Sequence, residues 1–101
     1  MTPRELKTRL ERGETIRILD VREPMEWNHC NVGGIHIPLG ELESRIGELD
    51  SDSSYAVLCH HGVRSAHAVG YLRSRGFANV DNISGGIEEW AQTLDPSLKR
   101  Y

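Results

Sequence analysis

The stretch Tyr55-Ala56-Val57-Leu58-Cys59-His60-His61-Gly62-Val63-Arg64-Ser65 decides the fold, because a strand, a polar loop and the start of a helix follow one another in it. Residues 55–58 are short and apolar, which predicts a buried strand. From Ser65 to about Arg75, apolar side chains recur at helical spacing. Cys59 is therefore expected at a strand-to-helix turn.

The loop from Cys59 to Ser65 has the composition of an anion-binding nucleophile loop. Its backbone N–H groups and the positive end of the following helix both favour a negative charge at the sulfur of Cys59, and the thiolate is the nucleophilic form of cysteine. The alternative is a buried core cysteine, which is usual for this residue type. The neighbouring histidines, glycine and arginine argue against so dry a site.

We expect Cys59 to be the catalytic nucleophile and the next five residues to bind the substrate, namely His60, His61, Gly62, Val63 and Arg64. Arg64 has two interpretations. It either binds anionic oxygens of the substrate or turns outward and anchors the loop to a carboxylate such as Asp20 or Glu23. Ser65 is expected to support the site by capping the following helix, with a hydrogen bond to the sulfur as the alternative.

A metal site is the other chemistry that Cys59, His60 and His61 suggest, because three donors stand in a row. Adjacent residues seldom present their side chains to one ion, and structural zinc sites use separated pairs of ligands. We therefore expect no metal and no other cofactor. The two histidines are expected at the rim of the loop, where they would add partial positive charge near neutral pH.

Asp20, Arg22 and Cys30, which precede the loop in the sequence, are also relevant to the site. Asp20 and Arg22 stand at the carboxyl end of a predicted strand, where they are expected to form a charged network that fixes the loop from below. A solvated strand end is the alternative. Cys30 is expected to be an incidental, partly buried thiol, although it would be able to resolve an oxidised Cys59 if it approached the loop.

Strand and helix patterns alternate along the whole chain. Thr2-Pro3-Arg4-Glu5 has the capping-box spacing of a helix start. Strands are predicted over 16–21, 35–37, 55–58 and 80–83, and helices over 39–49, 65–75 and 87–94. The pattern predicts an α/β fold with a small, open, mostly parallel sheet and helices on both faces. Ligands bind such sheets at the carboxyl ends of the strands, where Cys59 stands.

Length and composition limit the classes of function. The chain has 101 residues, 38% of them hydrophobic, and a net charge of -3, which predicts one soluble domain over residues 1–101. A nucleic-acid binder is not expected, since its basic residues would be in excess and clustered. No apolar stretch is long enough for a membrane span or a signal peptide. We therefore expect a cytoplasmic protein with free thiols.

The motif Cys-x-x-Gly-x-Arg-Ser, formed by residues 59–65, resembles the active-site loop of the rhodanese family of sulfurtransferases. Three further segments resemble parts of that family in the family's order. They are Leu19-Asp20-Val21-Arg22-Glu23-Pro24-Met25-Glu26-Trp27, Gly33-Gly34-Ile35-His36-Ile37-Pro38 and Gly85-Gly86-Ile87-Glu88-Glu89-Trp90. Together the four segments reach from Leu19 to Trp90.

The resemblance implies a rhodanese-like fold and transfer of sulfur in two steps. The Cys59 thiolate would attack the outer sulfur of a small anionic donor, thiosulfate or a persulfide, and become a persulfide. A thiol, cyanide or a protein would then accept that sulfur. His60 stands where some family members have arginine, so the natural donor is left open.

Two alternatives to this enzyme come from the same family. Tyrosine phosphatases of the cell-cycle type share the fold and have five residues between Cys and Arg, whereas four separate Cys59 from Arg64, a smaller ring that suits a single sulfur. Other rhodanese-like domains are regulatory modules without the cysteine, which this chain retains. The segment 95–101 resembles the end of rhodanese domains attached to sulfur-carrier adenylyltransferases, so a protein acceptor is also possible.

Overall fold

The computed structural model describes all 101 residues. Its helices are α1 (Pro3–Glu11), α2 (Pro24–His29), α3 (Leu42–Arg45), α4 (Val63–Ser74) and α5 (Gly86–Thr93). Its strands are β1 (Arg17–Asp20), β2 (Ile35–His36), β3 (Tyr55–Leu58) and β4 (Val80–Asn82). None of the helices combines the length and the apolar character needed to cross a membrane.

The four strands form one parallel sheet in the order β2-β1-β3-β4, which confirms the predicted fold class. In the pairing of β1 with β3, Asp20 lies opposite Leu58. The residues that follow these two strands therefore emerge at the same edge of the sheet. This register brings Arg22 and Cys59, which are far apart in the sequence, into one region.

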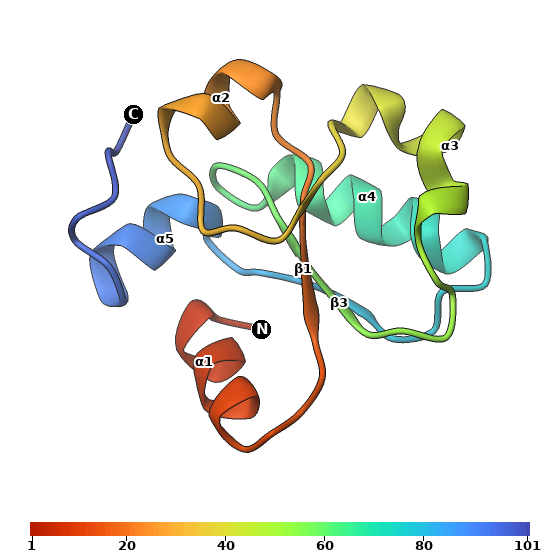
Figure 1. Cartoon of the computed structure of the whole chain (residues 1–101), viewed down its shortest axis with the longest axis horizontal. Coiled ribbons are helices and arrows are strands. Elements are labelled where there is room, and N and C mark those ends of the chain that lie inside the picture. Colours follow the sequence, from red (N-terminus) through yellow and green to blue (C-terminus); the bar gives the residue numbers. More distant parts are fainter.

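Helices cover both faces of the sheet, with α3 and α4 on one side and α1 and α5 on the other (Figure 1). Strand β3 alternates between the two layers. Tyr55 and Val57 pack with the α3 and α4 side, and Ala56 and Leu58 with the α1 and α5 side. All four side chains are buried, because a central parallel strand is covered on both faces.

The helix predicted over residues 39–49 is not continuous. It consists of a 3-10 turn (Leu39–Glu41), the single α-turn α3 and a second 3-10 turn (Ile46–Glu48). Glycines at 40 and 47 are weak helix formers, and short 3-10 turns still keep every third residue on one side. The apolar spacing thus predicted the packed face correctly, since Leu39, Leu42, Ile46 and Leu49 all contact the same core cluster.

Candidate functional site

Cys59 directly follows β3 and lies in the core. The residue is only 1% exposed and belongs to the apolar cluster that includes Val57 and Ala68. The expectation of a wet environment was wrong, because Cys59 continues the alternation of β3 toward α4. Its sulfur nevertheless has polar neighbours on the loop side. Sγ accepts the N–H of Gly62 at 3.0 Å and lies 3.2 Å from Ser65 Oγ.

Gly62 turns the loop back toward the sulfur. Its φ of +106° lies in the left-handed region, which glycine adopts without the strain of a Cβ. Gly62 is also the N-cap residue of α4, so the positive end of this helix begins beside Cys59. Among the N–H groups from His60 to Arg64, the one that donates to Sγ is that of Gly62.

The outer side of the loop is held by the start of α5. The N–H of Ile87 donates to the carbonyl oxygen of Cys59 at 2.9 Å, and the N–H of Glu88 to that of His60 at 3.1 Å. Gly86 makes this approach possible, because a Cβ at this position would overlap both carbonyl oxygens. The backbone of the loop is therefore fixed independently of its side chains.

Ser65 does not cap α4, so that prediction was wrong. The helix begins two residues earlier, at Val63, since Gly62 takes the N-cap position. Ser65 is fully buried in the first turn, and its hydroxyl lies against the sulfur of Cys59, the arrangement considered as the alternative. The same hydroxyl donates to Asn82 Oδ1 at 2.5 Å.

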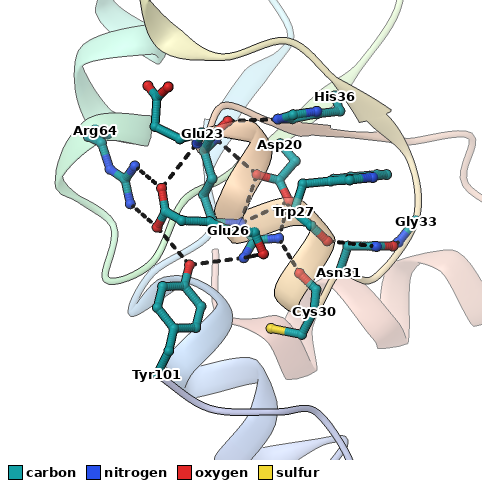
Figure 2. Close-up of polar contacts among 11 residues, drawn as sticks. Asp20, Glu23, Glu26, Trp27, Cys30, Asn31, Gly33, His36, Arg64 and Tyr101 are labelled. Atoms are coloured by element: carbon teal, nitrogen blue, oxygen red, sulfur yellow. Dashed lines mark hydrogen bonds and ion pairs between the residues drawn. The ribbon is translucent and has the colours of Figure 1, made fainter.

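Arg64 pairs with Glu26 of α2 (Figure 2). Its Nη1 and Nη2 donate to Glu26 Oε1 and Oε2 at 2.6 and 2.8 Å. The hydrogen bonds from Arg64 lower the pKa of Glu26 to about 2, against the raising effect of burial. The same bonds raise the pKa of Arg64 above its usual range. The geometry favours the anchoring interpretation, with Glu26 as the carboxylate in place of Asp20 or Glu23.

Asp20 and Arg22 form a fully buried ion pair. Arg22 Nη2 donates to Asp20 Oδ2 at 2.7 Å, and Arg22 also donates to the carbonyl oxygen of Cys30 at 2.8 Å and to the Tyr101 hydroxyl at 2.9 Å. Burial acts to lower the pKa of Arg22. Its hydrogen bonds to Asp20 and Tyr101 outweigh burial, so the pKa lies above its usual range. The expected charged network exists, and it holds α2 and the C-terminal segment rather than touching the loop itself.

His60 is stacked between the rings of His61 and Tyr101, with centroid distances of 3.9 Å on each side. Burial, followed by the proximity of His61, lowers the pKa of His60. This lowered pKa disfavours the positive charge that was predicted for His60 near neutral pH. His61 is exposed at the rim, as expected. Val63, a further candidate for substrate binding, is 68% exposed.

Both cysteines are free, and Cys30 is partly buried, as expected. No group of three His, Cys, Asp or Glu side chains is arranged to hold a metal ion. Glu26, Asn82 and Tyr101 contact the site and were not among the residues predicted for it. Asn82 had a usable signal, because it ends the strand next to β3 at the same edge of the sheet. The Tyr101 hydroxyl donates to Glu26, 75 residues earlier in the chain, and nothing in the sequence around Tyr101 indicated this hydrogen bond.

The parallel sheet with helices on both faces makes this chain an α/β protein, and the chain belongs to the rhodanese-like family. The family model for the rhodanese-like domain matches residues 2–93. This match confirms the resemblance found in the four sequence segments.

Several relatives are similar over the same region. A probable adenylyltransferase/sulfurtransferase of Mycobacterium tuberculosis is 35% identical over 100% of this chain and 26% of its own length. A putative sulfur carrier protein of Bacillus subtilis is 38% identical over 83% of this chain and 46% of its own. The chain thus spans less than half the length of these relatives. The crystal structure of a rhodanese-related protein from Thermoplasma volcanium has a TM-score of 0.84 and 35% identity, covering 93% of this chain and 91% of that one.

Proposed function

We propose that this chain is a sulfurtransferase that carries a sulfane sulfur on Cys59. The family and the names of its relatives support sulfur transfer as the class of function. The single observation that carries the assignment to Cys59 is the position of its sulfur. It lies at the carboxyl end of β3, with the Gly62 N–H directed at it from 3.0 Å.

The proposed reaction has two balanced steps. In the first, the Cys59 thiolate attacks the outer sulfur of thiosulfate, the S–S bond of the donor breaks, and sulfite leaves with the electron pair. In the second, an acceptor such as cyanide attacks the outer sulfur of the persulfide, and Cys59 leaves as the thiolate. The N–H of Gly62 and the positive end of α4 stabilise the anionic sulfur, as an oxyanion hole does for oxygen.

The burial of Cys59 bears on the substrates. With the residue only 1% exposed, a donor or acceptor has to present a small terminal sulfur or carbon atom to the loop. A protein acceptor that presents a thiol at the tip of an extended segment meets this condition. The relative named as a putative sulfur carrier supports such an acceptor for this chain as well. We place the reaction in the cytoplasm, where a reducing environment keeps such thiols free.

A phosphatase is less well supported. In that chemistry, an arginine beside the nucleophilic cysteine would bind the oxygens of a phosphate group. Here both guanidinium Nη atoms of Arg64 are engaged by Glu26. The four-residue spacing and this ion pair both favour sulfur transfer.

Intact-mass measurement after incubation with thiosulfate or a small persulfide tests the proposal. The parent and the Cys30→Ser variant are expected to gain the mass of one sulfur atom, and addition of cyanide should remove it. The Cys59→Ser variant should gain nothing. Uptake that persists without Cys59, or no uptake from either donor together with hydrolysis of an aryl phosphate, would refute the proposal.

A further inference from the structure

Asn82 lies at the end of β4 and contacts two parts of the Cys59 site. Its Nδ2 donates to the carbonyl oxygen of Gly62 at 3.0 Å, and its Oδ1 accepts the Ser65 hydroxyl at 2.5 Å. The first bond fixes the orientation of the amide, because the carbonyl oxygen of Gly62 can only accept. Oδ1 must then face Ser65.

The Ser65 hydroxyl has a single proton to donate. While that proton is held by Asn82, the hydroxyl offers only lone pairs to the sulfur of Cys59, 3.2 Å away. This arrangement matches a protonated thiol, which can donate its proton to Ser65. A thiolate would receive the N–H of Gly62 but no proton from Ser65 in this arrangement.

We propose that Asn82 is a positioning residue that directs the Ser65 hydroxyl away from Cys59 and so holds the resting nucleophile in its thiol form. When Cys59 becomes an anion, Ser65 must release Asn82 to donate to the sulfur. Asn82 and the thiolate thus compete for one proton. This inference rests on the proposed function in so far as Cys59 is the nucleophile.

A purely structural effect of Asn82 would act in the opposite direction. Its bond to Gly62 supports the loop whose N–H donates to the sulfur, so loss of this bond alone would disfavour the thiolate. The two effects therefore have opposite signs. Only the effect on the direction of the Ser65 hydroxyl requires Ser65, whereas the support of the loop through Gly62 does not.

The experiment is the pH profile of the alkylation rate of Cys59 by iodoacetamide, which requires no sulfur donor. All variants carry Cys30→Ser, so that Cys59 is the only thiol. Asn82→Leu is compared with the parent in the presence of Ser65 and in the Ser65→Ala background. Arg64, the charged group closest to Cys59 in the loop, keeps its partner Glu26 in every variant, and Glu88 remains beside His60.

With Ser65 present, Asn82→Leu is expected to lower the midpoint of the profile by about one pH unit, because the thiolate gains a hydroxyl donor. In the Ser65→Ala background the same substitution should leave the midpoint unchanged or raise it. Asn82→Asp retains an acceptor oxygen for Ser65 and should not lower the midpoint. If Asn82→Leu does not fold, Asn82→Val carries the same expectation at this strand end.

Equal shifts in both backgrounds would overturn the proposal, as would a lowered midpoint in Asn82→Asp. These outcomes are independent of sulfur transfer. The mass measurements with a sulfur donor decide the proposed function, whereas the alkylation profiles alone decide the role of Asn82.

Discussion

Two adjacent regions of this molecule differ in the charge of the groups that make their polar contacts. Around α2, the cations Arg22 and Arg64 are paired with carboxylates in close geometry, and Tyr101 joins them through its hydroxyl. Around Cys59, the polar contacts come from neutral groups, the N–H of Gly62 and the hydroxyl of Ser65. The two regions meet through Arg64, which belongs to the loop and pairs with Glu26 of α2, and through the ring of Tyr101, which stacks on His60 of the loop.

Different groups therefore hold the loop in place and stabilise the sulfur of Cys59. The Arg64–Glu26 ion pair joins the loop to α2 through two bonds at once, in addition to the backbone bonds that α5 makes to the loop. The charge of the sulfur is left to a single N–H and the helix start, which are present before any substrate binds. An arginine beside a cysteine in the sequence therefore does not by itself indicate an arginine that contacts the substrate.

Among the variants of the charged region, Arg22→Leu is expected to have the largest effect on stability. This substitution leaves the Asp20 carboxylate buried without its partner, which we expect to lower the free energy of unfolding by about 3–5 kcal/mol. Urea denaturation measures the change. Arg22→Lys keeps the charge but loses bonds of the guanidinium, so an intermediate loss is expected. A loss below about 1 kcal/mol in Arg22→Leu would mean that the pair contributes little.

Glu26→Gln tests the link between the two regions. The pair with Arg64 is partly exposed, so its loss should cost only about 1 kcal/mol of stability. Arg64 would then be free to bind anionic oxygens, and the KM for thiosulfate should fall. The matched control is Glu43→Gln, which removes an exposed carboxylate that has no ion-pair partner. A KM that rises in Glu26→Gln would instead show that the anchored loop is the binding-competent one.

The pH dependence of stability sharpens the same comparison. Arg64 lowers the pKa of Glu26 from 4.5 to about 2 in the folded chain. The stability contributed by this carboxylate is thus complete above about pH 4.5 and is lost as the pH falls toward 2. The difference in denaturation midpoint between the parent and Glu26→Gln should shrink over this range. A constant difference would contradict the lowered pKa.

The smallest effect is expected from Tyr101→Phe. The variant loses the hydroxyl bonds to Arg22 and Glu26 but keeps the ring that stacks on His60, so the loss should be about 0.5–1 kcal/mol. Tyr71→Phe is the control, since the Tyr71 hydroxyl is buried without a partner and its removal should cost nothing.

The same variant has a spectroscopic signature. Burial raises the pKa of Tyr101 to about 12, so an absorbance titration of the parent should contain a late tyrosine that Tyr101→Phe lacks. The neutral phenol is favoured by folding, and its contribution to stability is therefore present below pH 10 and lost as the pH rises through about 12. An unchanged titration would contradict the assignment.

The sequence was sufficient for the fold because the decisive signals were local. A four-residue apolar run between a turn and a polar loop predicts a strand covered on both faces, and β3 has the predicted bounds, Tyr55–Leu58. The position of Cys59 at the strand end follows from the same run. The broken helix over residues 39–49 was missed because apolar spacing reports the packed face and not the continuity of hydrogen bonds.

The details of the site depended on contacts between distant segments. Glu23 and Glu26 both follow β1, and the partner of Arg64 is Glu26, a contact between residues 38 positions apart that no local pattern indicates. Ser65 was assigned as a cap because serine is favoured there, but Gly62 adopts the conformation that starts the helix earlier. Burial lowers the pKa of His60, and part of the cover is the ring of Tyr101, which lies 41 residues later in the sequence.

The contact of Gly86 with the loop has a consequence for protein engineering. Because the carbonyl oxygens of Cys59 and His60 accept hydrogen bonds from the start of α5, the seven residues from Cys59 to Ser65 are not a portable unit. A graft of this loop onto another parallel sheet would have to bring the segment 85–88 with it, placed beside the acceptor strand. The loop and the segment 85–88 that holds its backbone are separated in the sequence by the rest of α4 and by β4.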